Sequence, residues 1–159
     1  MGTLADLVRV DHILVDTSAT SSDEIIRALA STLVDSEHVA PGYADACIAR
    51  EATDPTGLPM PGAAVAIPHA DPELVIEPAV AIGTPSRPVV FQQMDEPDLD
   101  LEVSAVFLLA LDGAGSQLAA LRQVAEFVQD ATRLDALISA ETADEVRDII
   151  AAHSKEPSS

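Results

Sequence analysis

The sequence has 159 residues, of which 48% are hydrophobic, so it is long enough to bury one core and short for two domains. Its formal net charge of −19 disfavours nucleic acids and anionic lipid surfaces as partners, because like charges repel. The longest apolar run, 105–111, is far shorter than the roughly 18 residues of a membrane span, and no basic-then-apolar leader is visible. The sequence therefore predicts a soluble, cytoplasmic protein with no direct membrane insertion.

The N-terminal part predicts one strand followed by two helices. A short apolar stretch between two aspartates predicts the strand at 11–16. Ser21 and Glu24 stand three residues apart, as in a capping box, and apolar residues follow at helical spacing. A second helix is expected over 42–52, before the turn-forming TDPTG. Cys47, the single cysteine, lies on the apolar face of this helix, so it is predicted to be a core residue.

The middle of the chain predicts extended segments. Valine and isoleucine are frequent at 64–67, 79–83 and 89–92, and proline or glycine separates these stretches. The acidic stretch 96–102 is predicted to be a loop. The nearly all-apolar run at 103–111 is typical of a strand buried on both faces.

The C-terminal third predicts helices, and a disordered tail is expected at 154–159. Polar residues that can cap these helices are Ser116, then Asp130 or Thr132, then Thr142 with Glu145. Helices from both ends of the chain can then cover both faces of one sheet. The predicted fold is a single three-layer α/β/α domain over 1–153, around a central mixed sheet.

One histidine is set apart from the others by its backbone. Pro68 fixes its own φ and keeps the preceding residue extended, and Pro72 restricts Asp71 in the same way. His69 is therefore presented on a stiff support at the end of a strand, which is where α/β sheets place their sites. The other three are expected to be ordinary surface or edge residues: His12, His38 and His153.

The residues alone leave the role of His69 open between a structural residue, a general base, a metal ligand and a nucleophile. A base normally needs a nucleophile beside it, and no G-x-S-x-G or cysteine motif is present. A metal site needs several ligands, and only Asp71 stands at a suitable spacing. A nucleophilic imidazole needs the fewest neighbours, because its neutral form is available near pH 7.

The stretch REATDPTGLPMPGAAVAIPHAD, 50–71, resembles the active-site segment of enzyme IIA domains of the bacterial phosphotransferase system, mannitol–fructose class. Its PTGLP and IPHAD are most similar to the galactitol-type branch. The resemblance continues in order through PVVFQQM, the apolar strand, SQLAALRQVAEFVQD and TADEV. It implies the mannitol/fructose-type IIA fold.

Residue by residue, the resemblance implies that His69 is the phosphoryl acceptor and that Arg50 lies near the phosphoryl group. Many members of the class have a second histidine where this chain has Gln117, a substitution that the galactitol-like branch shares. A guanidinium group suits phosphoryl oxygens, and the start of a helix at Gln117 would favour an anion. Thr56 and Gly57 are expected to shape the adjacent loop, with Gly57 supplying backbone freedom.

The resemblance implies a phosphoryl carrier that accepts the group from phospho-HPr and passes it to a cysteine of a IIB component, with a membrane IIC component downstream. It implies transfer through Nε2 of the histidine, no cofactor and no metal. Two alternatives remain: a regulatory IIA domain of the nitrogen-related branch, without sugar transport, and a binding module on the same fold whose histidine does not turn over.

Overall fold

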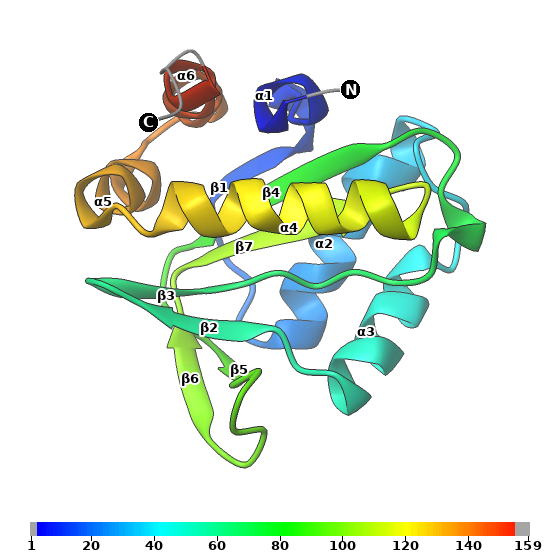
Figure 1. Ribbon diagram of the computed structural model, residues 1–159, viewed down its shortest axis with the longest axis horizontal. Coiled ribbons are helices and arrows are strands. Elements are labelled where there is room, and N and C mark those ends of the chain that lie inside the picture. The colour runs from blue at the N-terminus through cyan, green and yellow to red at the C-terminus, as the bar shows by residue number, and fades with distance from the viewer. Residues whose placement is uncertain (1–2, 155–159) are drawn as a thin grey trace.

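The computed structural model describes residues 3–154, which form a five-stranded mixed sheet between two layers of helices (Figure 1). The strands lie in the order β1 (Ile13–Thr17), β4 (Ala79–Pro85), β7 (Ala105–Ala110), β3 (Ala63–Ala66) and β2 (Gly57–Met60). β1 pairs parallel with β4, and β7 parallel with β3, whereas the β4–β7 and β3–β2 pairs are antiparallel. The predicted three-layer fold with a central mixed sheet is confirmed.

The two faces of the sheet are covered by different parts of the chain. One face packs against α1 (Leu4–Leu7), α4 (Ala114–Val128), α5 (Ala131–Ser139) and α6 (Ala143–Ser154). The other packs against α2 (Ser22–Asp35) and α3 (Tyr43–Thr53). Side chains of β7 alternate between these two cores, and all six of its residues are buried. The prediction of a strand buried on both faces is therefore correct.

Polar side chains cap the helices at most of the predicted positions. Ser21 accepts a hydrogen bond from the Glu24 N–H at 3.2 Å. Thr142 accepts the corresponding bond at the start of α6 at 3.1 Å. Asp130, and not Thr132, caps α5 by accepting a backbone N–H at 3.0 Å. These side chains satisfy donors that have no partner inside the helix.

The prediction of an acidic loop at 96–102 is wrong for the second half of this stretch. Asp100–Val103 forms β6, which pairs antiparallel with β5 (Val89–Gln92) in a separate two-stranded sheet. In β6 the acidic side chains are exposed, while Val103 is fully buried in the core on the α2 side. The alternation of acidic and apolar residues was therefore the signal of a strand with one buried face.

β2, which contains Pro59, was not predicted from the sequence. β2 is an edge strand, and such a strand tolerates proline because one side of its backbone needs no partner. The tight turn into β3 uses Pro61 and Gly62, whose φ of 85° is in the region that favours glycine. The hairpin formed by β2 and β3 leads directly to His69.

Two histidines expected at the surface are buried instead. His12 ends a 3₁₀ turn (Val10–His12) before β1 and is 0% exposed, and His38 is 6% exposed. The Ser36 hydroxyl lies 2.7 Å from Nε2 of His12 and 2.8 Å from Nδ1 of His38, so the two rings share one polar partner. His153 is half-buried and packs edge-on against the ring of Phe127.

The predicted disordered tail, 154–159, lies outside the described residues except for Ser154, at which α6 ends. Within residues 3–154, no helix combines the length and the apolar character needed to cross a bilayer.

Gly57 is required for a different reason from the one expected. Its φ is not in the left-handed region, so backbone freedom is not what it supplies. A Cβ atom at this position would lie 2.5 Å from the Gln92 carbonyl oxygen and 3.2 Å from a methyl carbon of Leu101. The close approach of β2 to the β5–β6 sheet therefore requires a residue without a side chain.

We predict that Gly57→Ala destabilises the protein by about 1–3 kcal/mol, because the new methyl group must displace backbone. Gly115→Ala is the matched control, since a Cβ there meets no atom within 4 Å apart from its chain neighbours and the nearby backbone of α4. Urea unfolding followed by circular dichroism measures both changes. Equal stability of the Gly57→Ala and Gly115→Ala variants would show that the hairpin can move aside.

Candidate active site

The segment after β3 is fixed at the edge of the sheet. The Pro68 carbonyl accepts the Leu109 N–H at 2.9 Å, which continues the pairing of β3 with β7 as far as His69. The buried hydroxyl of Tyr43, in the first turn of α3, donates to the Leu109 carbonyl at 2.6 Å. His69 is thus held at a strand end, as the proline pattern predicted.

One ring nitrogen of His69 is committed to the backbone. Nδ1 lies 2.9 Å from the carbonyl oxygen of Ile67. A carbonyl can only accept, so Nδ1 carries the hydrogen, and Nε2 of the neutral ring keeps its lone pair. Within the described residues, Nε2 forms no hydrogen bond. The half-buried ring therefore offers Nε2 as a nucleophile or base.

Burial lowers the pKa of His69 below its ordinary value, although the hydrogen bond to Ile67 opposes this effect. The Arg50 charge lowers this pKa further, and the carboxylates of Asp54 and Asp71 raise it. The net direction is downward, so the imidazole of His69 is predominantly neutral at pH 7.

Arg50 lies in the last turn of α3, close enough to His69 to affect its pKa. Its Nη1 is 3.0 Å from a carboxylate oxygen of Asp71, and its Nε is 3.6 Å from Asp54. Nε is buried and has no hydrogen-bond partner among the described residues. Arg50 is therefore both a helix-end charge paired with carboxylates and a cation beside the imidazole.

Gln117 is placed at the same edge of the sheet but differs from the expectation. β3 and β7 are parallel, so α4, which follows β7, begins at the end of the sheet where the chain leaves β3 (Figure 1). His69 follows β3 at this end. The helix starts at Ala114 with Gly113 as its N-cap, so Ser116 does not cap it. The Gln117 N–H is already bonded to Gly113 at 2.9 Å. In the part of the chain that the structure describes, its side chain forms no hydrogen bond with His69 or Arg50.

Glu51 is the residue that sequence reasoning missed. Its two carboxylate oxygens accept hydrogen bonds from the backbone N–H and the hydroxyl of Thr56, at 2.8 and 2.9 Å. Thr56 was expected only to shape the loop, yet its hydroxyl also accepts the Ile67 N–H at 3.0 Å. The signal available in the sequence for this contact was a glutamate five residues before a threonine, with a turn between them.

Two other predictions concern Asp71 and Cys47. Asp71 accepts a hydrogen bond from Arg50, and within residues 3–154 no three histidine, cysteine, aspartate or glutamate side chains lie together as possible metal ligands. Cys47 is fully buried beside Tyr43, and burial raises the pKa of its thiol to about 12. Its predicted core position is confirmed, and an inert thiol is expected.

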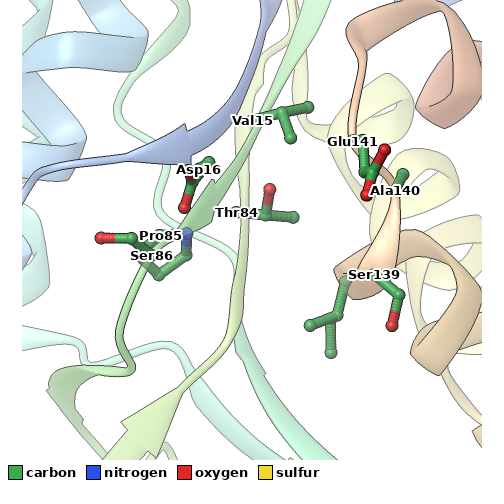
Figure 2. Close-up of a pocket in the computed structure, with 9 residues that line it drawn as sticks. Val15, Asp16, Thr84, Pro85, Ser86, Ser139, Ala140 and Glu141 are labelled. Carbon is green, nitrogen blue, oxygen red and sulfur yellow. The ribbon is translucent and has the colours of Figure 1, made fainter.

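A separate hollow of about 470 Å³ lies away from His69, and Figure 2 shows the residues around it. It is lined by the ends of β1 and β4, including Asp16 and Thr84, and by the segment after α5, including Glu141. β4 runs antiparallel to β7, so this hollow is at the opposite edge of the sheet. Among the described residues that line it there is no histidine or cysteine, and none of them is part of the His69 site.

A comparison with known protein families identifies the class of protein to which this fold, with His69 at the end of β3, belongs. The chain belongs to the family described as "Phosphoenolpyruvate-dependent sugar phosphotransferase system, EIIA 2", whose model matches residues 6–153. The family and the IIA-type fold inferred from the sequence are confirmed.

Similar proteins include the galactitol-specific EIIA component of Escherichia coli K12, which is 35% identical over 97 residues. That alignment covers 61% of this chain and 64% of the E. coli component, which is less than two thirds of its length. A putative IIA domain from Streptococcus pyogenes has 26% identity and a TM-score of 0.79, with 99% of both chains covered. The nitrogen regulatory IIA protein of Neisseria meningitidis has 27% identity and a TM-score of 0.76, over 92% of this chain and 98% of that protein.

We predict that His69 titrates below pH 6.5, because burial penalises its charged form more than the Ile67 carbonyl and the nearby carboxylates favour it. The neutral, nucleophilic ring should therefore persist to a lower pH than the ring of an unperturbed histidine. The chemical shift of the His69 Cε1 proton, followed by NMR over pH 4–9, gives the pKa. A pKa above 6.5 would mean that the charges of Asp54 and Asp71 raise the pKa of His69 more than burial lowers it.

Proposed function

We propose that this chain is the phosphoryl-carrier component, IIA, of a bacterial sugar or polyol phosphotransferase system of galactitol type, acting in the cytoplasm. His69 accepts a phosphoryl group from phospho-HPr and passes it to a cysteine of a IIB component, which serves a membrane IIC component. The observation that carries the proposal is the hydrogen bond from Nδ1 of His69 to Ile67, which leaves Nε2 as the nucleophile.

In the proposed reaction, the lone pair of Nε2 attacks phosphorus in line with the N–P bond of the donor. The new N–P bond forms as the old one breaks, and the electron pair of the old bond returns to the donor imidazole. His69 then carries both the phosphoryl group and the Nδ1 hydrogen, so its ring is cationic, and the Ile67 carbonyl stabilises that hydrogen. The transfer is an exchange between two imidazoles and requires no cofactor.

Arg50 is proposed to bind the oxygens of the phosphoryl group during transfer. Phosphoryl transfer spreads negative charge over three oxygens, so catalysis depends mainly on positioning and on compensating charge. In the described structure the guanidinium is paired with Asp71 at the exposed rim. An arriving phosphoryl group would compete with that carboxylate for the same donors. Gln117 is proposed to add a neutral hydrogen-bond donor from the start of α4.

A second candidate function is regulation by a nitrogen-type IIA domain, which the similarity to the N. meningitidis protein favours. The PTGLP loop, Gln117 and the likeness to the galactitol-specific component favour transport. Incubation of the phosphorylated chain with a galactitol-type IIB distinguishes the two, since a transport component should lose its phosphoryl group to the IIB cysteine. A module that only binds would gain no label from phospho-HPr.

We predict that His69→Ala abolishes acid-labile phosphorylation by phospho-HPr, because among the four histidines, all of which the structure describes, His69 alone follows a strand end with Nδ1 held by a backbone carbonyl. Mass spectrometry of the intact protein under neutral conditions measures the added phosphoryl group. His153→Ala is the control and should be labelled like the wild-type protein, since His153 packs against Phe127 away from the site. Persistent labelling of the His69→Ala variant would refute the assignment.

We predict that Arg50→Ala slows phosphoryl uptake by about 100-fold or more, the loss typical of one preorganised charged donor. Gln117→Ala should cost less, because a neutral donor stabilises developing charge more weakly. Arg27→Ala is the control, since Arg27 pairs with Asp45 on the surface of α2 and α3. Rapid-quench measurements give the rates. A normal rate for a folded Arg50→Ala variant would show that Arg50 serves only as a charge at the end of α3.

A further inference from the structure

The hydrogen bonds around Thr56 have a fixed direction. An amide N–H can only donate, so the Ile67 N–H donates to the Thr56 hydroxyl oxygen at 3.0 Å. A hydroxyl has one hydrogen, and the Thr56 hydroxyl directs it to Glu51 at 2.9 Å. The carboxylate of Glu51 receives a second bond from the Thr56 backbone at 2.8 Å. Glu51 is therefore the terminal acceptor of the chain of bonds.

This chain of bonds ends at the residue that orients the imidazole. The N–H of Ile67 is held by Thr56, and its carbonyl is held by Nδ1 of His69. The Ile67 side chain is 1% exposed, and Pro68 stiffens the backbone that follows. A shift of Ile67 would therefore move or release the acceptor of the Nδ1 hydrogen.

The arrangement is buried, so its bonds do not exchange easily with water. Thr56 is 2% exposed, and Glu51 is half-buried beneath the turn that follows α3. Removing one partner would leave a buried donor or acceptor unsatisfied, which costs more than the net contribution of the bond itself. The same helix also supplies Tyr43, whose hydroxyl fixes Leu109 on the other side of His69.

We propose that Glu51 is a positioning residue for phosphoryl transfer, acting through the Thr56 hydroxyl and Ile67 to keep Nδ1 of His69 protonated and Nε2 turned to the incoming phosphorus. Glu51 does not touch the reacting atoms. This inference rests on the proposed function, but its effect on the ring exists without any phosphoryl donor.

Thr56→Val tests the proposal, because it keeps the shape of the side chain and replaces only the hydroxyl, by a methyl group. We expect phosphoryl uptake to slow by about 10-fold or more, the order expected for a misplacement below 1 Å. We also expect the ¹⁵N shifts of the unphosphorylated His69 to change from a single Nδ1–H tautomer to a mixture. Thr56→Ser, which keeps the oxygen, should restore both the rate and the tautomer.

Thr84→Val is a matched control, because Thr84 is 3% exposed, its hydroxyl has no hydrogen-bond partner among the described residues, and it lies at the opposite edge of the sheet. It should leave the rate and the His69 tautomer unchanged. Glu51→Gln should give an intermediate effect, since an amide can accept only one of the two bonds from Thr56. If Thr56→Val does not fold, the Glu51→Gln variant decides the question by the same two measurements.

The proposal would be overturned if the folded Thr56→Val variant showed the wild-type rate and a single Nδ1–H tautomer. The same result in Glu51→Gln would overturn it if Thr56→Val does not fold. Glu51 would then have only a structural role. Reduced stability with an unchanged tautomer would have the same meaning. If His69→Ala is still phosphorylated, the proposed function fails, but the tautomer of His69 in Thr56→Val still reports whether Glu51 orients the ring. The two failures are therefore distinguishable.

Discussion

The hydrogen bond between Nδ1 of His69 and the Ile67 carbonyl is the contact on which the site depends. It fixes the tautomer, the orientation of the ring and the nitrogen that remains available. The two residues that form this bond are only two positions apart in the sequence. The bond nevertheless keeps its geometry only if the backbone of Ile67 is held in place. Thr56 holds the N–H of Ile67, Pro68 restricts the backbone after it, and Leu109 of β7 fixes the next carbonyl.

The mixed sheet explains how distant parts of the chain meet at this bond. β3 and β7 run parallel, so their carboxyl ends lie at one edge, where His69 and the start of α4 both follow. α3 packs beside this edge and supplies Tyr43, Arg50 and Glu51 within three turns. The helix thus supplies a cation near the imidazole and two hydrogen-bonding groups that fix the backbone on either side of it.

The sequence predicted most of the fold because its strongest signals are local. Helix caps such as Ser21 and Thr142, and the continuous apolar run that became β7, depend on neighbours a few residues away. The strands it missed, β2 and β6, contain few residues with a high strand propensity, although β6 alternates acidic and apolar residues, and they pair with β3 and β5. Strand formation of this kind depends on partners and not on intrinsic preference.

By itself, the sequence determined that His69 stands on a rigid strand end, because Pro68 and Pro72 constrain the backbone wherever they occur. It also determined that Cys47 lies in the core, since helical spacing decides which face a residue occupies. Only the tertiary structure decided which carboxylates pair with Arg50, where α4 begins, and that Glu51 supports the imidazole through Thr56. It also buried His12 and His38 around Ser36. These features are contacts between side chains and backbone groups that the folded chain brings together, and no local pattern specifies which partner each group finds.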